Sequence, residues 1–357
     1  MIGRFEIVDS NAARPAAERI LFCDGSGGRL FREGADLELS HWRPNRTPRE
    51  YRADTSTGIC FRFLDAPQGG PWTVAINNHL DVDGILSVYV LVHSRHALTE
   101  RETIISAAEM GDFWGWGERK AQRLFQGLTR LMDELRPRGV VPREIYERAF
   151  GRIPELIDRT DSETRAIEAS LEPLTRGVSL VEQGAIVRTQ HGPRFAHYVI
   201  PLSVAGEDDA RASYVPGFNE AISEKAVLWP QARARWDDER VCVVSTERAG
   251  GWFHAVWFPG YLWADTENRW LVPGMRYHDG MESYDLNHPP LADALARLQS
   301  EEKGEGQWAI GNGASPFHHA LQSQFPVVCR FADEAGGAAL SQLPPRQVAE
   351  ALDGVFI

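Results

Sequence analysis

The stretch Asn78-His79-Leu80-Asp81-Val82-Asp83-Gly84-Ile85-Leu86-Ser87 decides how the N-terminal half of the chain folds. The residues before it, 72–78 (WTVAINN), are rich in β-formers, and residues 84–93 after it are apolar almost all round. The stretch therefore joins a predicted strand to a predicted buried helix. Asp81 and Asp83 stand two residues apart, so both carboxylates project to the same side of an extended chain. Gly84 would let the backbone turn tightly after them.

Two chemical interpretations of this stretch stay open at the level of the residues. The carboxylates of Asp81 and Asp83, with the imidazole of His79, suit Mn²⁺ or Mg²⁺ better than Zn²⁺, and the amides of a following helix favour a phosphate oxygen. The plainer interpretation is that the two acids only cap a helix and are solvated.

Working outward, further strands and helices frame this stretch. Upstream, the runs 19–24 (RILFCD) and 37–41 (LELSH) each read as a strand that ends at a polar residue. Downstream, the spacing of apolar residues predicts helices over 99–110, 118–135, 142–158 and 161–172. Short β-like runs then return at 184–189, 195–202, 241–246 and 252–258. We therefore predict an α/β domain over residues 1–175, with a mostly parallel sheet flanked by helices. A smaller, β-rich α+β domain follows over residues 176–357.

Composition narrows the class of function. The chain has 357 residues, enough for about two domains, and a formal net charge of −12. An acidic chain repels a phosphate backbone, so a small substrate or a short nucleic-acid end is favoured over duplex nucleic acid. The first ten residues lack the pattern of a secretory signal, and there is no run of 18 apolar residues. We therefore expect a cytoplasmic protein with no membrane partner.

Several motifs together resemble those of the DHH phosphoesterase family. HLDVDGILS (79–87) resembles the family's first motif, FCDGS (22–26) the second, LELSHWRPN (37–45) the third, and Gly111-Asp112-Phe113 the Gly-Asp loop of the fourth. TSTG (55–58) resembles the helix start that follows the third motif. The motifs stand in the order two, three, one, four, so the sequence looks like a circularly permuted DHH domain. Permutation is tolerable because the termini of a domain usually lie close together.

The resemblance implies a hydrolase that holds two Mn²⁺ ions per chain, with Mg²⁺ as the other candidate. Asp24 would bridge the two ions, His79 and Asp81 would complete one, and Asp83, His41 and Asp112 the other. The implied activity is that of a phosphoesterase, in which two metals activate water against a small phosphorylated or nucleotide substrate. The catalytic residues implied are Asp24, His41, Asp81 and Asp83.

One departure from the family pattern opens an alternative function. The Asp-His-His of the family is Ser40-His41-Trp42 here, so the presumed metal ligand His41 is kept while Trp42 replaces the His that contacts the phosphoryl group. The alternative is a catalytically weak or inactive DHH-like sensor that binds a metal-phosphate ligand. A third possibility is an unrelated α/β protein whose DxDG segment merely caps a helix.

Candidates for substrate binding lie in three loops. Arg43, Asn45 and Arg46 belong to HWRPNRTPREYR (41–52), where arginine pairs well with phosphate. In the C-terminal domain, His254 follows a Gly-Gly pair, and Gly313, His318 and His319 belong to GNGASPFHH. Both loops are vaguely similar to the Gly-Gly-His loop of the family's accessory domain. The plainer interpretation of these segments is an arginine-rich solvated loop and ordinary turns.

Overall fold

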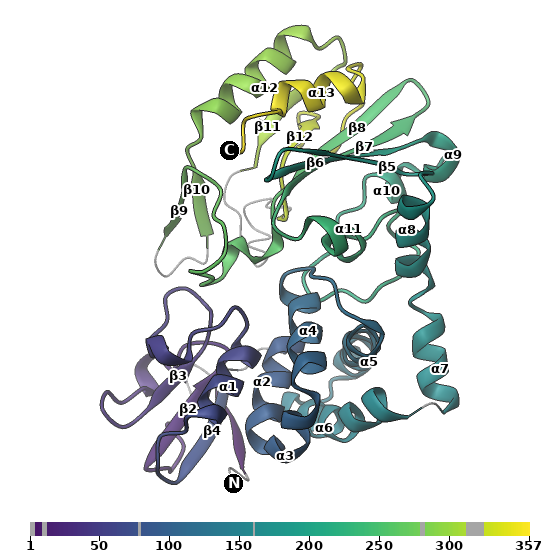
Figure 1. The fold of residues 1–357 in the computed structure, drawn as a ribbon. Helices are drawn as coiled ribbons and strands as arrows, with labels where there is room; N and C mark the ends of the chain where they lie inside the picture. The colour runs from purple at the N-terminus through teal and green to yellow at the C-terminus, as the bar shows by residue number, and fades with distance from the viewer. Residues whose placement is uncertain (1–3, 9–12, 78–79, 160, 279–282, 312–324) are drawn as a thin grey trace. The chain divides into compact units, whose positions relative to one another are not determined.

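The computed structural model describes residues 4–8, 13–77, 80–159, 161–278, 283–311 and 325–357. The chain divides into two compact units (Figure 1). The first comprises Met1–Leu171 together with two short segments from later in the chain, Asn219–Ala221 and Ala264–Thr266. The second comprises Glu172–Phe218, Ile222–Trp263 and Glu267–Ile357.

The first unit is built on a four-stranded sheet. Its strands are β1 (Phe5–Val8), β2 (Arg19–Cys23), β3 (Leu37–Leu39) and β4 (Trp72–Asn77). They lie in the order β1-β4-β2-β3, and every pairing among these strands is parallel. The carboxyl ends of all four strands therefore lie at one edge of the sheet.

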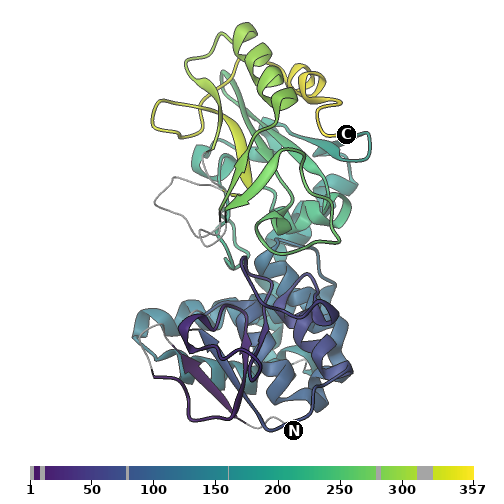
Figure 2. The same cartoon turned by 90° about the vertical axis from the view of Figure 1, so that its left-hand side faces the viewer.

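Helices cover this sheet, as Figure 2 shows from a second side. They are α1 (Ser56–Asp65), α2 (Val82–Val92), α3 (Ser94–Ala97), α4 (Arg101–Asp112), α5 (Arg119–Leu135), α6 (Pro142–Asp158) and α7 (Ser162–Ala169). Helix α2 packs on β2 and β4, α1 packs on β3, and α6 packs on β1. Because α1, α4, α5 and α6 also pack on α2, residues Val82–Leu91 are all buried. This explains why the sequence there is apolar on every side.

The second unit is built on a six-stranded sheet of order β11-β12-β8-β7-β6-β5. Among the strand pairings of its described residues, β6 with β7 is parallel and the others are antiparallel. The strands are β5 (Val187–His191), β6 (Phe195–Ile200), β7 (Val241–Arg248), β8 (Gly251–Trp257), β11 (Gln307–Ile310) and β12 (Val327–Ala332), with a separate antiparallel pair β9 (Met275–His278) and β10 (Ser283–Leu286). The helices are α8 (Glu172–Glu182), α9 (Leu202–Ala205), α10 (Asp209–Ala212), α11 (Pro230–Asp237), α12 (Pro289–Glu301) and α13 (Pro345–Leu352).

The predicted fold class is confirmed: a parallel sheet flanked by helices is followed by a β-rich region. The helix predicted over 142–158 has these bounds in the structure. Two boundaries near the key stretch differ from prediction. Helix α2 begins at Val82 because the Asp81 side chain caps it by accepting the N–H of Gly84. Helix α4 runs on to Asp112, so Gly111 and Asp112 lie on a helix and not in a loop.

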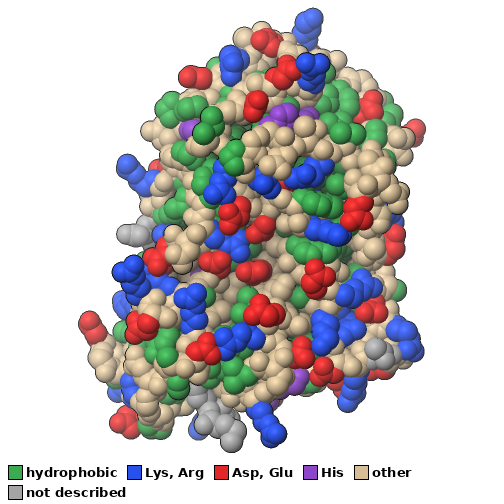
Figure 3. Space-filling model, in the orientation of Figure 1, with side chains coloured by type: hydrophobic (Ala, Val, Ile, Leu, Met, Phe, Trp, Pro, Cys, Tyr) green, Lys and Arg blue, Asp and Glu red, His purple; other side chains and the backbone are tan. Residues whose placement is uncertain are grey.

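The surface mixes charges of both signs. On the face drawn in Figure 3, acidic and basic side chains are interspersed among apolar ones. No helix within the described ranges is both long enough and apolar enough to cross a bilayer.

Candidate metal centre

The carboxyl edge of the four-stranded sheet gathers polar side chains from segments far apart in sequence. Asp24 directly follows β2, and His41 follows β3 after one intervening residue. Asp83 lies in the first turn of α2, which follows β4, and Asp112 is the last residue of α4. Asp24 holds a left-handed backbone conformation, with φ of 46°. Such conformations are sparsely populated by residues other than glycine, and they cluster at functional sites.

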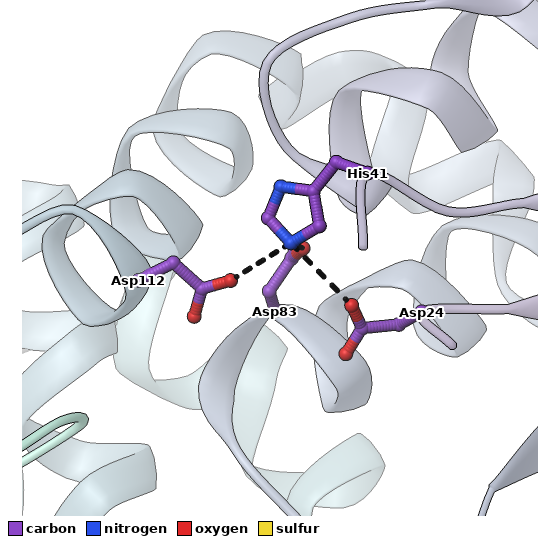
Figure 4. A group of neighbouring side chains, drawn as sticks. All are labelled: Asp24, His41, Asp83 and Asp112. Atoms are coloured by element: carbon purple, nitrogen blue, oxygen red, sulfur yellow. Dashed lines mark ion pairs between the residues drawn. The ribbon is translucent and has the colours of Figure 1, made fainter. Parts of the chain in front are cut away.

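The four side chains meet at one point (Figure 4). One ligand atom from each of Asp24, His41, Asp83 and Asp112 lies within 4.8 Å of all the others, and all four residues are buried. His41 Nε2 lies 3.2 Å from Asp112 Oδ2, 3.5 Å from Asp83 Oδ2 and 3.7 Å from Asp24 Oδ1. Three carboxylates and one imidazole thus share a small, buried volume.

Contacts behind the cluster fix the orientation of His41 and Asp83. The Nδ1 of His41 lies 2.6 Å from the carbonyl oxygen of Asp54, so Nδ1 carries a proton and donates it while Nε2 faces the carboxylates. Metal-binding histidines are held in this way by a partner on the other ring nitrogen. The two carboxylate oxygens of Asp83 accept the backbone N–H groups of Ser56 and Thr57, both at 2.8 Å, at the start of α1.

The Asp24 carboxylate is held by two further donors. Its Oδ1 accepts the hydroxyl of Ser56 at 2.9 Å and the indole N–H of Trp42 at 2.8 Å. Trp42 therefore lies against the predicted bridging ligand. Trp42, the aromatic residue next to His41, thus contacts the cluster directly.

Burial and mutual repulsion shift the pKa values of the cluster. Burial alone would lower the pKa of His41, but the hydrogen bond to Asp112 and the charges of Asp83, Asp112 and Asp24 outweigh it and raise this pKa to about 10. Burial, followed by the charge of Asp24, raises the pKa of Asp83. Burial likewise raises the pKa of Asp112 well above its usual range. The raised pKa values of Asp83 and Asp112 mean that burial and the neighbouring carboxylates disfavour the charged form of both side chains when no cation is bound.

Asp81 lies beside this cluster but is not one of the four. It caps α2, as the plainer interpretation of the DxDG segment expected, with Oδ1 2.7 Å from the N–H of Gly84. The same interpretation expected both acids to be solvated, and that part is wrong, because Asp81 and Asp83 are buried. The expected tight turn at Gly84 is wrong, because Gly84 lies within α2. Glycine is required there by lack of space: a Cβ would lie 2.9 Å from both Asp24 Oδ2 and Asp81 Oδ1, and 3.1 Å from the Tyr146 hydroxyl. Asp24, Asp81 and Tyr146 therefore surround the same small space above α2.

Two segments from later in the chain also contact residues of the cluster, although neither segment carries a motif or a periodic pattern. The amide of Asn219 donates to Asp112 Oδ1 at 3.2 Å and accepts the N–H of Val82 at 3.0 Å. It thereby links the end of α4 to the start of α2. The backbone N–H of Asp265 donates to the carbonyl oxygen of His41 at 2.7 Å. Gly111 is small because a Cβ there would lie 2.4 Å from Asn219 Oδ1.

The predicted substrate-binding residues of the first unit have protein partners. Arg43 pairs with Asp265 at 3.2 Å, and the amide of Asn45 donates to the same carboxylate at 3.1 Å. Arg46 pairs at 3.1 Å with Glu38, a buried residue that also accepts the backbone N–H of Arg46. These contacts give the three residues a role in holding the loop after β3.

The remaining predicted residues lie elsewhere or outside the described residues. His254 belongs to β8 of the second unit, where it is buried, with Nδ1 2.8 Å from the Ser245 hydroxyl and Nε2 3.0 Å from the carbonyl oxygen of Leu343. His79, Gly313, His318 and His319 lie outside the described residues. Of the six predicted metal ligands, the structure brings four into one cluster and places Asp81 next to it.

The part of the chain that carries this cluster matches the model of a known protein family. Residues 10–238 match the model of a family of unknown function, DUF6687. The chain belongs to this family. No curated protein and no solved structure matches it. The DUF6687 match spans all four residues of the cluster and Asn219, and it continues past the first unit into the second.

The donor set of this DUF6687 chain fits a hard divalent cation. Three carboxylates and one imidazole nitrogen are ligands typical of Mn²⁺ and Mg²⁺. Around an octahedral ion with ligands at about 2.1 Å, neighbouring ligand atoms lie about 3 Å apart and opposite ones about 4.2 Å apart. The distances of 3.2, 3.5 and 3.7 Å from His41 Nε2 lie between these two values, whereas the limit of 4.8 Å for all four ligand atoms is somewhat wider than such an ion requires. A bound cation would favour the charged form of the buried carboxyl groups.

Proposed function

We propose that this protein is a divalent-metal-dependent phosphoesterase, with Mn²⁺ or Mg²⁺ held by Asp24, His41, Asp83 and Asp112. The observation that supports the proposal most is the buried approach of these four side chains to within 4.8 Å of one another. We further propose that the first unit is a circularly permuted relative of the DHH phosphoesterases, with Asp81 and His79 completing a second metal site beside Asp24. A cytoplasmic setting belongs to the same proposal.

In this proposal the chain's own residues bind the metal and hold its ligands in a fixed orientation. Asp54 aims His41 Nε2 at the carboxylates through its carbonyl oxygen, and Asn219 holds Asp112 by one oxygen so that the other faces His41. The Ser56 hydroxyl fixes Asp24. When bound, divalent ions supply Lewis acidity, which lowers the pKa of water and stabilises charge that develops on phosphoryl oxygens. Because the ligand side chains are already held in place, they would not need to rearrange when the metal binds or the reaction proceeds.

The substrate class proposed is a small phosphorylated metabolite, a nucleotide or a short nucleic-acid end. The net charge of −12 and the mixed charges on the surface argue against a long polyanion. Arg43 and Arg46, the arginines closest in sequence to His41, already pair with Asp265 and Glu38. Recognition of the substrate would therefore rest mainly on the metal site.

One observation favours a second candidate, a sensor that binds a metal-phosphate ligand with little or no turnover. In the motif that resembles the third motif of the DHH phosphoesterases, Trp42 stands where that family has the histidine that contacts the phosphoryl group. Its indole N–H already donates to Asp24 at 2.8 Å. Loss of a group that stabilises the transition state lowers rates by about two orders of magnitude or more. Binding of metal and phosphate would survive such a loss better than hydrolysis.

Metal analysis and an assay for hydrolysis separate these candidates. Protein purified without chelator should hold about two Mn²⁺ ions per chain for either candidate. Hydrolysis of bis(p-nitrophenyl) phosphate or of a dinucleotide, lost in Asp83→Asn, supports the phosphoesterase. Saturable binding of inorganic phosphate that requires metal, without turnover, supports the sensor.

The matched control is Asp65→Asn, the same substitution at an exposed position at the end of α1. This variant should retain the metal content and activity of the wild type. A chain that binds neither Mn²⁺ nor Mg²⁺ would refute both candidates.

A further inference from the structure

The second unit contains a pocket in which every charged lining residue is basic. Residues of β6, β7, β8 and β12 of the six-stranded sheet line it, together with residues of α10, α11 and the chain between these two helices; Figure 1 shows where these elements lie. Arg211, Arg233 and Arg330 line it, and among its described lining residues there is no Asp or Glu. The remaining wall is mostly apolar, with Phe253 and Trp257 from alternate positions of β8. In a chain of net charge −12, such a lining is unexpected.

The pocket is small. Its volume is about 40 Å³, measured as the space open to the centre of a water molecule. At roughly 10–15 Å³ per water on this measure, it holds about three waters. That space suits one ionic group of a few heavy atoms and is too small for a whole nucleotide.

Arg233 is the central basic group. It lies on α11, is 4% exposed, and its guanidinium carbon sits 4.2 Å from the centre of the Trp257 ring. Its Nε and Nη2 atoms are buried, and no acceptor for them exists among the described residues. The acid on the same helix, Asp237, already accepts from Arg188, Arg240 and Tyr198. Burial lowers the pKa of the Arg233 guanidinium overall, because attraction to Cys242 and Asp237 does not offset the cost of burying it; an anion in the pocket would therefore stabilise it.

Two neighbouring residues lack acceptors in the same way. The Nε1 of Trp257 and the Nε of Arg211 are buried, and the described residues offer them no acceptor. Arg211 makes one ion pair, from Nη2 to Glu224 at 3.4 Å. All the buried polar atoms without a partner in this lining are therefore N–H donors. Such a set is complementary to an oxyanion, which offers only acceptors.

We propose that this pocket binds the phosphoryl group of a small phosphorylated ligand. The donors come from four different elements, α10, α11, β8 and β12, so they approach an anion from several directions. A tetrahedral dianion matches that arrangement and the surplus of positive charge better than a planar carboxylate, which one guanidinium fork would satisfy. The proposal concerns the second unit alone and does not depend on the metal centre.

Calorimetric titration of the full chain with inorganic phosphate tests the proposal. The titration is done in EDTA, so that metal-bound phosphate does not contribute. We expect one saturable site per chain and a Kd at least about tenfold weaker in Arg330→Gln. Arg330 is half-buried, so its loss threatens folding less than loss of Arg233. The control is Arg346→Gln on α13, an exposed arginine that pairs only with Glu350 among the described residues.

Each other outcome overturns the proposal. Absence of saturable phosphate binding in the millimolar range refutes the site. An unchanged Kd in both Arg330→Gln and Arg211→Gln places any binding elsewhere. Acetate that binds at least as tightly as phosphate identifies a carboxylate site and makes the phosphoryl assignment wrong.

Discussion

Replacing Asp112 by Asn removes one charged ligand from the cluster while keeping the size of the side chain. Asp112 contributes one oxygen to the Asn219 amide at 3.2 Å and the other to His41 Nε2, also at 3.2 Å. Suppose Mn²⁺ is present at about 100 times its Kd, where binding stabilises the folded wild type by about 2.7 kcal/mol. If loss of the carboxylate weakens binding about 100-fold, that gain falls to about 0.4 kcal/mol at the same Mn²⁺ concentration.

Stability without metal distinguishes this effect from simple damage. In the absence of metal, burial and the neighbouring carboxylates raise the pKa of Asp112 well above its usual range, so the charged form of this side chain is disfavoured. Asparagine keeps the size of the side chain and an oxygen that can accept from Asn219, and it carries no charge. Loss of the contact with His41 costs about as much as one hydrogen bond, roughly 1 kcal/mol, and removal of the buried charge offsets that cost. In EDTA, Asp112→Asn should therefore be no less stable than the wild type.

Thermal unfolding with and without MnCl₂ measures both effects. For a unit of this size, 1 kcal/mol corresponds to about 2–4 °C in Tm. Mn²⁺ should raise the Tm of the wild type and of Asp65→Asn by about 5–11 °C, and that of Asp112→Asn by about 1–2 °C. An equal rise in Asp112→Asn would show that this carboxylate does not hold the metal. A large loss of stability in EDTA would show that repulsion in the cluster has been overestimated.

Four further predictions follow from the same geometry. Gly84→Ala should lower the free energy of unfolding in urea by about 1–3 kcal/mol and abolish Mn²⁺ binding, because the new Cβ would lie 2.9 Å from two carboxylate oxygens. Its control is Gly151→Ala, which should be neutral or slightly stabilising, because a Cβ at this position in α6 meets nothing within 4 Å. Asn219→Ala should weaken Mn²⁺ binding about 10–100-fold in calorimetry, since Asp112 loses its donor, whereas an unchanged Kd would deny Asn219 this role. In EDTA, wild-type stability should fall by up to about 1.4 kcal/mol per pH unit between pH 6.5 and about 10. In this pH range His41 keeps its proton in the folded protein, whereas the unfolded chain has released it. In His41→Gln, the midpoint of urea unfolding should therefore depend less on pH. If the lack of a histidine at position 42 limits the rate, Trp42→His should increase hydrolysis of bis(p-nitrophenyl) phosphate about tenfold or more. An unchanged rate would show that this position does not limit hydrolysis.

Elements with a strong local pattern could be predicted from the sequence. The apolar runs of β2 and β4 and the apolar periodicity of α6 lie in one continuous stretch each, so a window along the chain finds them. The convergence of Asp24, His41 and Asp83 was predicted from the resemblance to the DHH motifs, and it agrees with the way parallel strands deliver their ends to one edge of a sheet. The close contact at Gly84 could not be predicted, because a glycine required for lack of space looks the same in the sequence as a glycine required by a turn.

Residues that act through tertiary contacts left no such signal. Asn219 reaches Asp112 across 107 residues of sequence, and Asp265 reaches Arg43 from a segment that is assigned to the first unit only by its contacts. Neither residue belongs to a periodic pattern or a motif. The pocket in the second unit was missed for the same reason, because Arg211, Arg233 and Arg330 lie on three separate elements and meet only once the sheet is formed.

The order of the motifs along the chain does not affect the chemistry of the cluster. The strands that supply it are neighbours in space, in the order β4-β2-β3, although β4 comes last of the three in sequence. A ligand at the end of a parallel strand is positioned by the strand's neighbours and by the helix that follows, and both are local to that strand. Moving one strand with its helix to another point of the chain keeps those neighbours, provided the connections can be closed at the surface. The proposed permutation therefore requires only new connections, because the pairing of β2, β3 and β4 and the packing of α1 on α2 set the relative placement of Asp24, His41 and Asp83.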